Sequence, residues 1–166
     1  MDRFHNGAAI RLKSYHDNYL HADEDGESVT QDGNGLSNNA WWIVEYVRRF
    51  DGDYQKRWTH YNDSFESNKT IIIRLRNRYG RYLTASNRRF LLGATGRKVV
   101  QTLPSQLDSS VEWEAIWEGN RVKLKTRDGD DRFLRANGGL PPWRNSVTHD
   151  KPYRTSSQDL ILWDVV

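Results

Sequence analysis

Residues 73–85 read IRLRNRYGRYLTA, and the same pattern occurs twice more, as IRLKSYHDNYLHA at 10–22 and VKLKTRDGDDRFLRA at 122–136. Each copy opens with a run in which apolar and basic residues alternate. This period of two is typical of a β-strand with one face toward the core and the other toward solvent. A short turn rich in Gly, Asp and Asn follows, and then a second apolar run. Each copy therefore predicts a β-hairpin.

A tryptophan follows each hairpin. Trp42, Trp113 and Trp163 each begin a short, mostly apolar run that closes one copy. A large aromatic side chain that recurs at equivalent places of three units is typical of a layer in the hydrophobic core. We therefore expect these residues to pack inside the protein and not to form three cofactor sites.

A third strand is predicted between each hairpin and its tryptophan. These strands read VTQD at 29–32, VVQT at 99–102 and VTHD at 147–150. In this alignment His149 takes the place of Gln31 and Gln101. We therefore assign the His149 position to the scaffold.

The three copies together define the fold class. Four strands in each copy make twelve, and the chain has almost no helical periodicity. This pattern predicts an all-β protein, a single β-trefoil in which a six-stranded barrel is closed by three hairpins with pseudo-threefold symmetry. Closure removes the exposed edges of the sheet. We expect one domain over 1–166, with copies at 6–47, 68–118 and 119–166 and an insertion at 48–67.

The composition excludes several kinds of site. The chain has no cysteine, which rules out disulfides, thiol catalysis and zinc sites built on thiolates. No glycine-rich phosphate loop, HExxH or GxSxG motif occurs, and the five histidines show no metal-ligand spacing. We therefore expect a protein that is not an enzyme and that uses no cofactor and no metal.

The sequence also carries a prediction of location. The N-terminal residues contain no apolar core of a secretory signal, and no apolar run approaches the length of a membrane span. We expect a cytoplasmic protein that is not secreted, with the nucleus as an alternative. The glycosylation sequons at Asn62 and Asn68 then stay unused, because glycosylation needs a secretory route.

Charge is distributed unevenly along the chain. Residues 1–47 carry 3 Lys or Arg against 8 Asp or Glu, whereas residues 68–118 carry 9 against 4 and residues 119–166 carry 9 against 6. The first copy is therefore acidic, and the second and third are basic. A surface polarised in this way can steer acidic partners.

Several longer motifs carry a resemblance. The segments RYLTAS, LLGATGRKVVQTLP and RANGGLPPWRNSVTHD resemble the plant proteins of domain of unknown function 569, which are grouped with fascin-like, actin-cross-linking β-trefoils. The resemblance covers nearly the whole chain except 48–67. It implies a fascin-like trefoil and a connection with actin. It implies no catalytic residues.

The segment 48–67 departs from the pattern of that family, which has a short connection there. Its aromatic residues recur at steps of 4, 4, 3 and 4, a helical stripe: Phe50, Tyr54, Trp58, Tyr61 and Phe65. The stripe is consistent with aromatics that fold back onto the barrel or with a partly disordered loop. The alternative is an amphipathic element that binds a partner.

Candidate binding residues gather in two enlarged loops, at 86–97 and 137–145. They are the basic residues Arg88, Arg89, Arg97 and Lys98 around the first loop, and Trp143 and Arg144 at the tip of the second. We expect mainly structural roles at the tip of the second loop: Trp143 plugs the open end of the barrel, and Arg144 hydrogen-bonds carbonyls of its own loop. The functional alternative is one basic patch with flanking aromatics that meets acidic protein surfaces, phosphates or sugars, since arginine binds anions in a bidentate manner.

These features favour a non-enzymatic binding module. The resemblance and the basic copies favour association with actin filaments, which are acidic, through the second and third copies. Carbohydrate binding is the first alternative, although the Gln-x-Trp of ricin-type lectin repeats is missing and the nearest case, at 158–160, reads QDL. A protein-interaction scaffold that uses 48–67 is the second. Nucleic acid and anionic lipid are disfavoured, because no recognition motif for them occurs.

Overall fold

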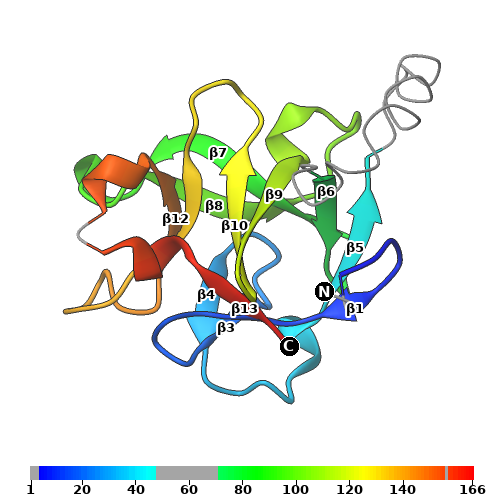
Figure 1. The fold of residues 1–166 in the computed structure, drawn as a ribbon, viewed down its shortest axis with the longest axis horizontal. Helices are drawn as coiled ribbons and strands as arrows, with labels where there is room; N and C mark the ends of the chain where they lie inside the picture. The colour runs from blue at the N-terminus through cyan, green and yellow to red at the C-terminus, as the bar shows by residue number, and fades with distance from the viewer. Residues whose placement is uncertain (1–3, 48–70, 156) are drawn as a thin grey trace.

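A computed structural model gives the structure of the protein and describes residues 4–47, 71–155 and 157–166. Within these residues the protein consists of β-strands joined by turns and five short 3-10 segments (Figure 1). No helix in the described part of the chain has the length and hydropathy of a membrane span. The strands are β1 (Ala9–Ile10), β2 (Leu12–Lys13), β3 (Tyr19–Ala22), β4 (Val29–Asp32), β5 (Trp42–Tyr46), β6 (Ile71–Arg76), β7 (Tyr82–Arg89), β8 (Arg97–Thr102), β9 (Trp113–Glu118), β10 (Arg121–Thr126), β11 (Phe133–Ala136), β12 (Val147–Asp150) and β13 (Trp163–Val165).

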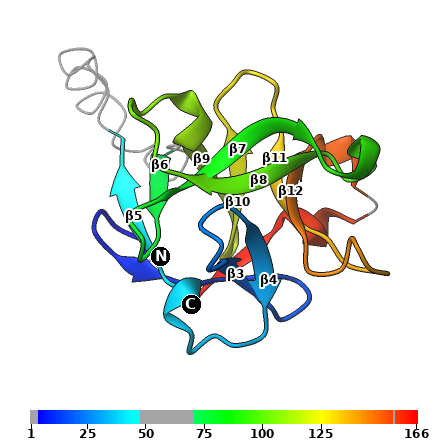
Figure 2. The same ribbon diagram turned by 180° about the vertical axis from the view of Figure 1, so that it is seen from behind.

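The first and last strands of the three copies form a closed barrel. Antiparallel pairs run around it from β1 through β5, β6, β9, β10 and β13 to β2, the strand that continues β1. The remaining strands form three hairpins, β3–β4, β7–β8 and β11–β12, that close one end of the barrel (Figures 1 and 2). The predicted β-trefoil is therefore confirmed.

The described residues form thirteen strands, one more than the repeat predicts. The extra strand arises because the first strand of the first copy is interrupted at Arg11, between β1 and β2. At this point the Arg11 backbone exchanges two hydrogen bonds with Val166, at 3.1 and 2.9 Å. The Arg11 side chain turns outward and its guanidinium lies 4.7 Å from the centre of the Trp41 ring. The interruption changes no strand order in the barrel.

The three repeated tryptophans form the predicted core layer. Trp42, Trp113 and Trp163 are fully buried. Each indole Nε1 donates a hydrogen bond to the carbonyl of the hairpin leucine in its own copy, at 3.0 to 3.1 Å: Leu20, Leu83 and Leu134. The three indoles therefore fill the core and also join the last strand of each copy to its hairpin.

Gln31, Gln101 and His149 link the three copies in a ring. Gln31 of the first copy donates to the third copy, Gln101 of the second copy to the first, and His149 of the third copy to the second. The acceptors are the carbonyls of Asn137 and Ser146 at 2.9 Å for Gln31, of Asp23 and Ser28 at 2.9 and 3.0 Å for Gln101, and of Ser86 at 2.7 Å for His149. The His149 position is therefore part of the scaffold, as predicted from the repeat.

The buried His149 makes the stability of the protein sensitive to pH. Burial lowers the pKa of His149, and the charges of Arg132 and Arg97 act in the same direction, against the Ser86 hydrogen bond and Asp128. As the pH falls below the ordinary histidine pKa of about 6.5, the unfolded chain gains a proton that the folded protein does not. We expect the free energy of unfolding to fall by up to about 1.4 kcal/mol per pH unit in this range.

Urea unfolding at about pH 7 and about pH 5.5 measures this loss. The matched variant is His149→Gln, which restores the residue that the other two copies carry at this position. Its stability should change less between the two pH values than that of the natural chain. An equal loss in both proteins would assign the pH dependence to other groups.

The enlarged loop predicted at 86–97 is shorter in the structure, because strands continue into both of its ends. Strand β7 continues to Arg89, with a bulge after Ala85, and β8 begins at Arg97, so that only 90–96 forms a loop. This hairpin arm is stabilised from the third copy, because Arg97 and Lys98 of β8 pair with β12. The predicted insertion at 48–67 lies outside the described residues.

Candidate functional site

The candidate residues of the two loops are divided among cavities at the end of the barrel that the hairpins close. The cause is the alternation of side chains along the β7–β8 arm, since neighbours on a strand point to opposite faces. Arg88 and Lys98 line one cavity, Arg89 and Arg97 line another, and Trp143 lines a third. We call these the axial cavity, the arginine cavity and the Trp143 cavity. The set is therefore spread over several sites and does not form one patch.

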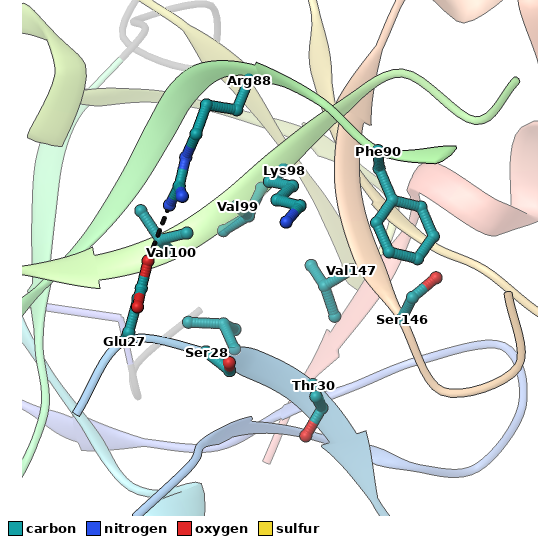
Figure 3. Close-up of a pocket in the computed structure, with 11 residues that line it drawn as sticks. Glu27, Ser28, Thr30, Arg88, Phe90, Lys98, Val99, Val100, Ser146 and Val147 are labelled. Atoms are coloured by element: carbon teal, nitrogen blue, oxygen red, sulfur yellow. Dashed lines mark hydrogen bonds and ion pairs between the residues drawn. The ribbon is translucent and has the colours of Figure 1, made fainter. Parts of the chain in front are cut away.

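The axial cavity lies on the pseudo-threefold axis, because equivalent residues of all three copies line it. It has a volume of about 410 Å³, and its lining includes Ser28, Lys98 and Ser146 at one equivalent position and Val29, Val99 and Val147 at the next. Figure 3 shows Arg88 reaching down to Glu27 on one side and the Phe90 ring on the other, with Lys98 between them. The Arg88 Nη2 to Glu27 Oε1 distance is 2.8 Å.

The polar groups of the axial cavity are mostly engaged. The hydroxyls of Ser28 and Thr30 donate to the carboxylates of Asp25 and Asp23, each at 2.6 Å. The Ser146 hydroxyl donates to the Trp143 carbonyl at 2.6 Å. Each of these bonds lies within one copy, so the hydroxyl groups of the axial cavity are engaged by their own hairpin or loop.

The arginine cavity occupies the opposite face of the same arm. Its volume is about 300 Å³. It is lined by Arg89 and Arg97 of the arm, by Leu92, Gly93 and Gly96 of the connecting loop, and by Arg132 and Arg154 of the third copy.

The Trp143 cavity is built mainly from the third copy and has a volume of about 440 Å³. Its lining includes four residues of the motif RANGGLPPW, namely Arg135, Asn137, Gly138 and Gly139, in addition to Trp143 itself. Ala94 and Thr95 of the β7–β8 arm, His16 of the first copy and Leu160 complete it. The motif therefore supplies one continuous wall of a cavity that three copies share.

Unsatisfied buried polar atoms gather around the Trp143 cavity. Among the described residues, no hydrogen-bond partner exists for the buried indole Nε1 of Trp143, Nε of Arg135, Oδ1 of Asn137 or Oγ1 of Thr95, whereas Arg135 Nη1 forms an ion pair with Asp150 at 3.5 Å. Arg135 is 8% exposed and Asn137 is 2% exposed. Buried polar groups are nearly always hydrogen-bonded in proteins, so this concentration of unpaired donors and acceptors points to a ligand or ordered water.

The neighbouring bonds fix how Asn137 presents its amide. Its Nδ2 donates to the hydroxyls of Ser146 and Thr148, each at 3.0 Å, so Oδ1 is the atom left without a partner. Asn137 Oδ1 is an acceptor, whereas the indole of Trp143 and the guanidinium of Arg135 can only donate. The lining of the cavity thus carries donors and an acceptor.

Two local features shape the Trp143 cavity. A Cβ atom at Gly138 would lie 2.6 Å from His16 Cε1, so only glycine lets the imidazole close this side. His16 Nε2 lies 3.2 Å from the Ala136 carbonyl, which holds the ring in place. On the outer side, Arg144 is exposed and its Nε donates to the Gly139 carbonyl at 3.0 Å, a contact within its own loop.

The comparison with protein families agrees with the fold. The family described as a beta-trefoil domain of unknown function (DUF569) matches residues 1–72 and 50–163. The chain belongs to this family. The match covers the motif that lines the Trp143 cavity and confirms the resemblance to the domain of unknown function 569. It also runs through 48–67, which the resemblance drawn from the sequence left out. Among curated proteins, none matches the sequence.

Solved structures show the same fold at low sequence identity. The SDF2-like protein from Arabidopsis thaliana is 17% identical, with 97% of this chain and 93% of that chain covered and a TM-score of 0.65. ThreeFoil, a designed threefold-symmetric protein, is 18% identical, with 95% and 97% covered and a TM-score of 0.62. The Polyporus squamosus lectin, bound to the epitope Neu5Aca2-6Galb1-4GlcNAc, is 15% identical, with 98% and 49% covered and a TM-score of 0.65.

Most residues of the Trp143 cavity were not singled out from the sequence. The sequence does single out Trp143, because an aromatic residue at the tip of a loop rich in proline and glycine is conspicuous. The repeat places Arg135 in the hairpin strand and Asn137 at the start of the enlarged loop at 137–145, and neither residue stands out as a candidate there. The available signal was their position inside the long family motif, at the start of the same stretch that ends in Trp143.

Proposed function

We propose that this protein is a carbohydrate-binding module and that the Trp143 cavity is its binding site. The observation that carries the proposal is the set of unpaired buried donors and acceptors around this cavity, next to a half-buried tryptophan. A cavity of about 440 Å³ is of the size that binds small molecules in proteins.

The chemistry of the lining suits a sugar. A hydroxyl group both donates and accepts, so one sugar hydroxyl can donate to Asn137 Oδ1 and accept from Trp143 Nε1 or Arg135. A carboxylate or a phosphate could not donate to Asn137. The Trp143 indole also offers an apolar surface for the C–H face of a pyranose ring, as aromatic side chains do at many interfaces.

The comparisons support this proposal only through the fold. The Polyporus squamosus lectin is a neighbour whose structure contains a bound oligosaccharide. At 15% identity the likeness concerns the trefoil and not the site. A trefoil can host unrelated functions, so the argument for sugar binding rests on the residues of the Trp143 cavity.

Association with actin filaments, which the resemblance implied, stays a prediction. It rested on one basic face formed by the second and third copies. The arginines and the lysine of the β7–β8 arm instead line two cavities on opposite faces. Two of them are paired with carboxylates of other copies, Arg88 with Glu27 and Arg97 with Asp130. A scaffold that uses 48–67 also stays a prediction, since this segment lies outside the described residues.

A glycan array with the labelled full chain, followed by calorimetry with the strongest ligand, tests the proposal. We expect saturable binding of a glycan. Replacing Trp143 by alanine should weaken binding at least about tenfold, because a buried tryptophan anchor typically contributes about 2 kcal/mol or more.

The matched control is Leu140→Ala, in the same loop. Leu140 is 72% exposed and does not line the Trp143 cavity, so this change should leave binding unaltered. Lys98→Ala, in the axial cavity, is a second control. A blank array, or a glycan whose affinity falls with Lys98→Ala and not with Trp143→Ala, would contradict the assignment.

A further inference from the structure

The arginine cavity brings four guanidinium groups together from distant parts of the chain. Arg89 and Arg97 come from the two strands of the β7–β8 arm, Arg132 precedes β11, and Arg154 lies in the 3-10 turn η5 (Pro152–Arg154). Arg154 Nη2 donates to the Gly93 carbonyl at 2.7 Å, which brings this turn against the end of the arm, as Figure 2 shows. The four groups face a cavity of about 300 Å³.

The positive charge of this region exceeds the negative charge that pairs with it. Only Asp130 and Asp150 form ion pairs with the lining arginines among the described residues. Lys151 also pairs with Asp130, at 2.7 Å, and Arg135 with Asp150, at 3.5 Å. The cations that share the two carboxylates, or lie beside them in the cavity, are Arg89, Arg97, Arg132, Arg135, Lys151 and Arg154.

The pairing within the cavity is incomplete. The distance from Arg97 Nη1 to Asp130 Oδ2 is 3.8 Å, and that from Arg154 Nε to Asp150 Oδ2 is 3.5 Å. Arg89 forms no ion pair with any described residue. These arginines therefore retain N–H donors for a further acceptor, since a guanidinium carries five.

The titration of neighbouring groups reflects the same excess of positive charge. Hydrogen bonds from Lys151 and Arg132 lower the pKa of Asp130 to about 2. The charges of Arg132 and Arg97 also help to lower the pKa of the buried His149. An anion in the cavity would relieve the repulsion among these cations.

The arm is held in position around the cavity by close packing. Gly96, with φ of +101°, lies so near β12 that a Cβ atom there would be 2.3 Å from the His149 carbonyl oxygen. Arg97 follows Gly96 directly and pairs in register with His149. Arg132 is held by bonds to Asp130 and Asp150, at 2.5 and 3.4 Å, and its side chain is 11% exposed. The site is therefore ordered before a ligand enters.

We propose that the arginine cavity binds a phosphate monoester. Guanidinium groups form bidentate, charge-assisted hydrogen bonds with phosphate oxygens, and a dianion with three terminal oxygens can engage several of them together. A carboxylate has fewer acceptor oxygens and a single charge. The volume of the cavity admits a phosphate group and a small part of the molecule that carries it.

The phosphate can belong to a soluble molecule or to the headgroup of a lipid. Two exposed apolar side chains lie near the cavity, one on the loop that connects β7 and β8 and one on η5. Leu92 is 97% exposed and lines the cavity, and Tyr153, beside Arg154, is 80% exposed. Both could enter the interface of a membrane if the phosphate were that of a lipid.

Calorimetric titration of the full chain with inorganic phosphate, at constant ionic strength set with sodium chloride, tests the site. We expect one saturable site. Arg89→Gln and Arg154→Gln should each weaken it about tenfold or more, as expected for the loss of a charge-assisted bond. Arg132 is left unchanged, because its nearly buried side chain pairs with both Asp130 and Asp150, whereas Arg154 is more exposed and pairs with Asp150 alone.

The matched control is Arg88→Gln, one residue away and on the opposite face of the arm. It removes the same charge and should leave phosphate binding unchanged. No saturable binding, or an equal loss in Arg88→Gln, would overturn the proposal, the latter by reducing it to general charge attraction. Melting temperatures of the variants, compared with the natural chain, show whether they are folded.

Vesicles then identify the source of the phosphate. Phosphatidylcholine vesicles with and without phosphatidylinositol 4-phosphate are sedimented with the protein. Pelleting only with the phosphorylated lipid, lost in Tyr153→Ser while inorganic phosphate still binds, supports the proposal with a lipid headgroup, since Tyr153 is exposed and does not line the cavity. Absence of pelleting together with phosphate binding supports it with a soluble ester.

Discussion

Replacing Trp42 by alanine is expected to lower the free energy of unfolding by about 3–5 kcal/mol, the range found when a large buried aromatic is truncated. Trp42 is fully buried in the core layer of the three tryptophans. The change removes its packing and also leaves the buried Leu20 carbonyl without the indole N–H that now donates to it at 3.1 Å. Because small domains are stable by only about 5–15 kcal/mol, the variant should unfold at a much lower concentration of urea.

The neighbouring residue offers a matched control. Trp41 is only half-buried, and the centre of its ring lies 4.7 Å from the Arg11 guanidinium, so Trp41→Ala should lower the free energy of unfolding by about 1 kcal/mol. Trp42→Phe should fall between the two, since it keeps most of the volume and loses the hydrogen bond. If Trp41→Ala destabilised the protein as much as Trp42→Ala, the core layer would not be the main source of stability.

Removing the carboxylate of Asp150 is expected to lower the free energy of unfolding by a similar amount, because this buried charge pairs with three arginines. Asp150 is fully buried and forms ion pairs with Arg132, Arg135 and Arg154, at 3.4 to 3.5 Å. Burial already lowers the pKa of Arg135, and the charge of Asp150 opposes that shift. Asp150→Ala leaves the Arg135 charge buried and unpaired, so we expect a loss of about 3–5 kcal/mol in the free energy of unfolding.

Urea unfolding of Asp150→Ala measures this loss, with Asp164→Ala as the control. Asp164 is an exposed carboxylate on β13, and its removal should change stability by less than about 0.5 kcal/mol. Equal effects of the two changes would contradict the view that Asp150 holds the cations together. Asp150→Asn, which keeps the shape and removes the charge, separates the electrostatic effect from the loss of packing.

The same aspartate connects stability with binding. Asp150 fixes Arg132 and Arg154, which line the arginine cavity, and Arg135, which lines the Trp143 cavity. The family motif that ends at Asp150 therefore lines the Trp143 cavity and, through Asp150, pairs with two arginines of the arginine cavity. This arrangement explains how one stretch of sequence can combine a scaffold with binding surfaces.

The faces on which the basic residues of 86–97 lie could not be predicted from the repeat pattern. The pattern predicts a loop at 86–97, in which neighbouring basic residues can share one face. In the structure, pairing with β12 extends β8 back to Arg97, and β7 extends to Arg89. Because Arg88 and Arg89 are neighbours on β7, their side chains point to opposite faces of the arm. The strand extension depends on another copy of the repeat, so no local pattern revealed it.

The trefoil, the tryptophan core and the scaffold role of His149 are predictable from the amino-acid pattern alone, because each follows from a pattern that recurs three times at matching positions. The cavity that each arginine lines, and the polar atoms left unpaired beside Trp143, depend on the folded arrangement of the three copies. These properties arise from contacts between residues far apart in the chain, such as Arg154 with Gly93 or His16 with Ala136. Such contacts break the symmetry of the repeat, and a repeating pattern carries no information about them.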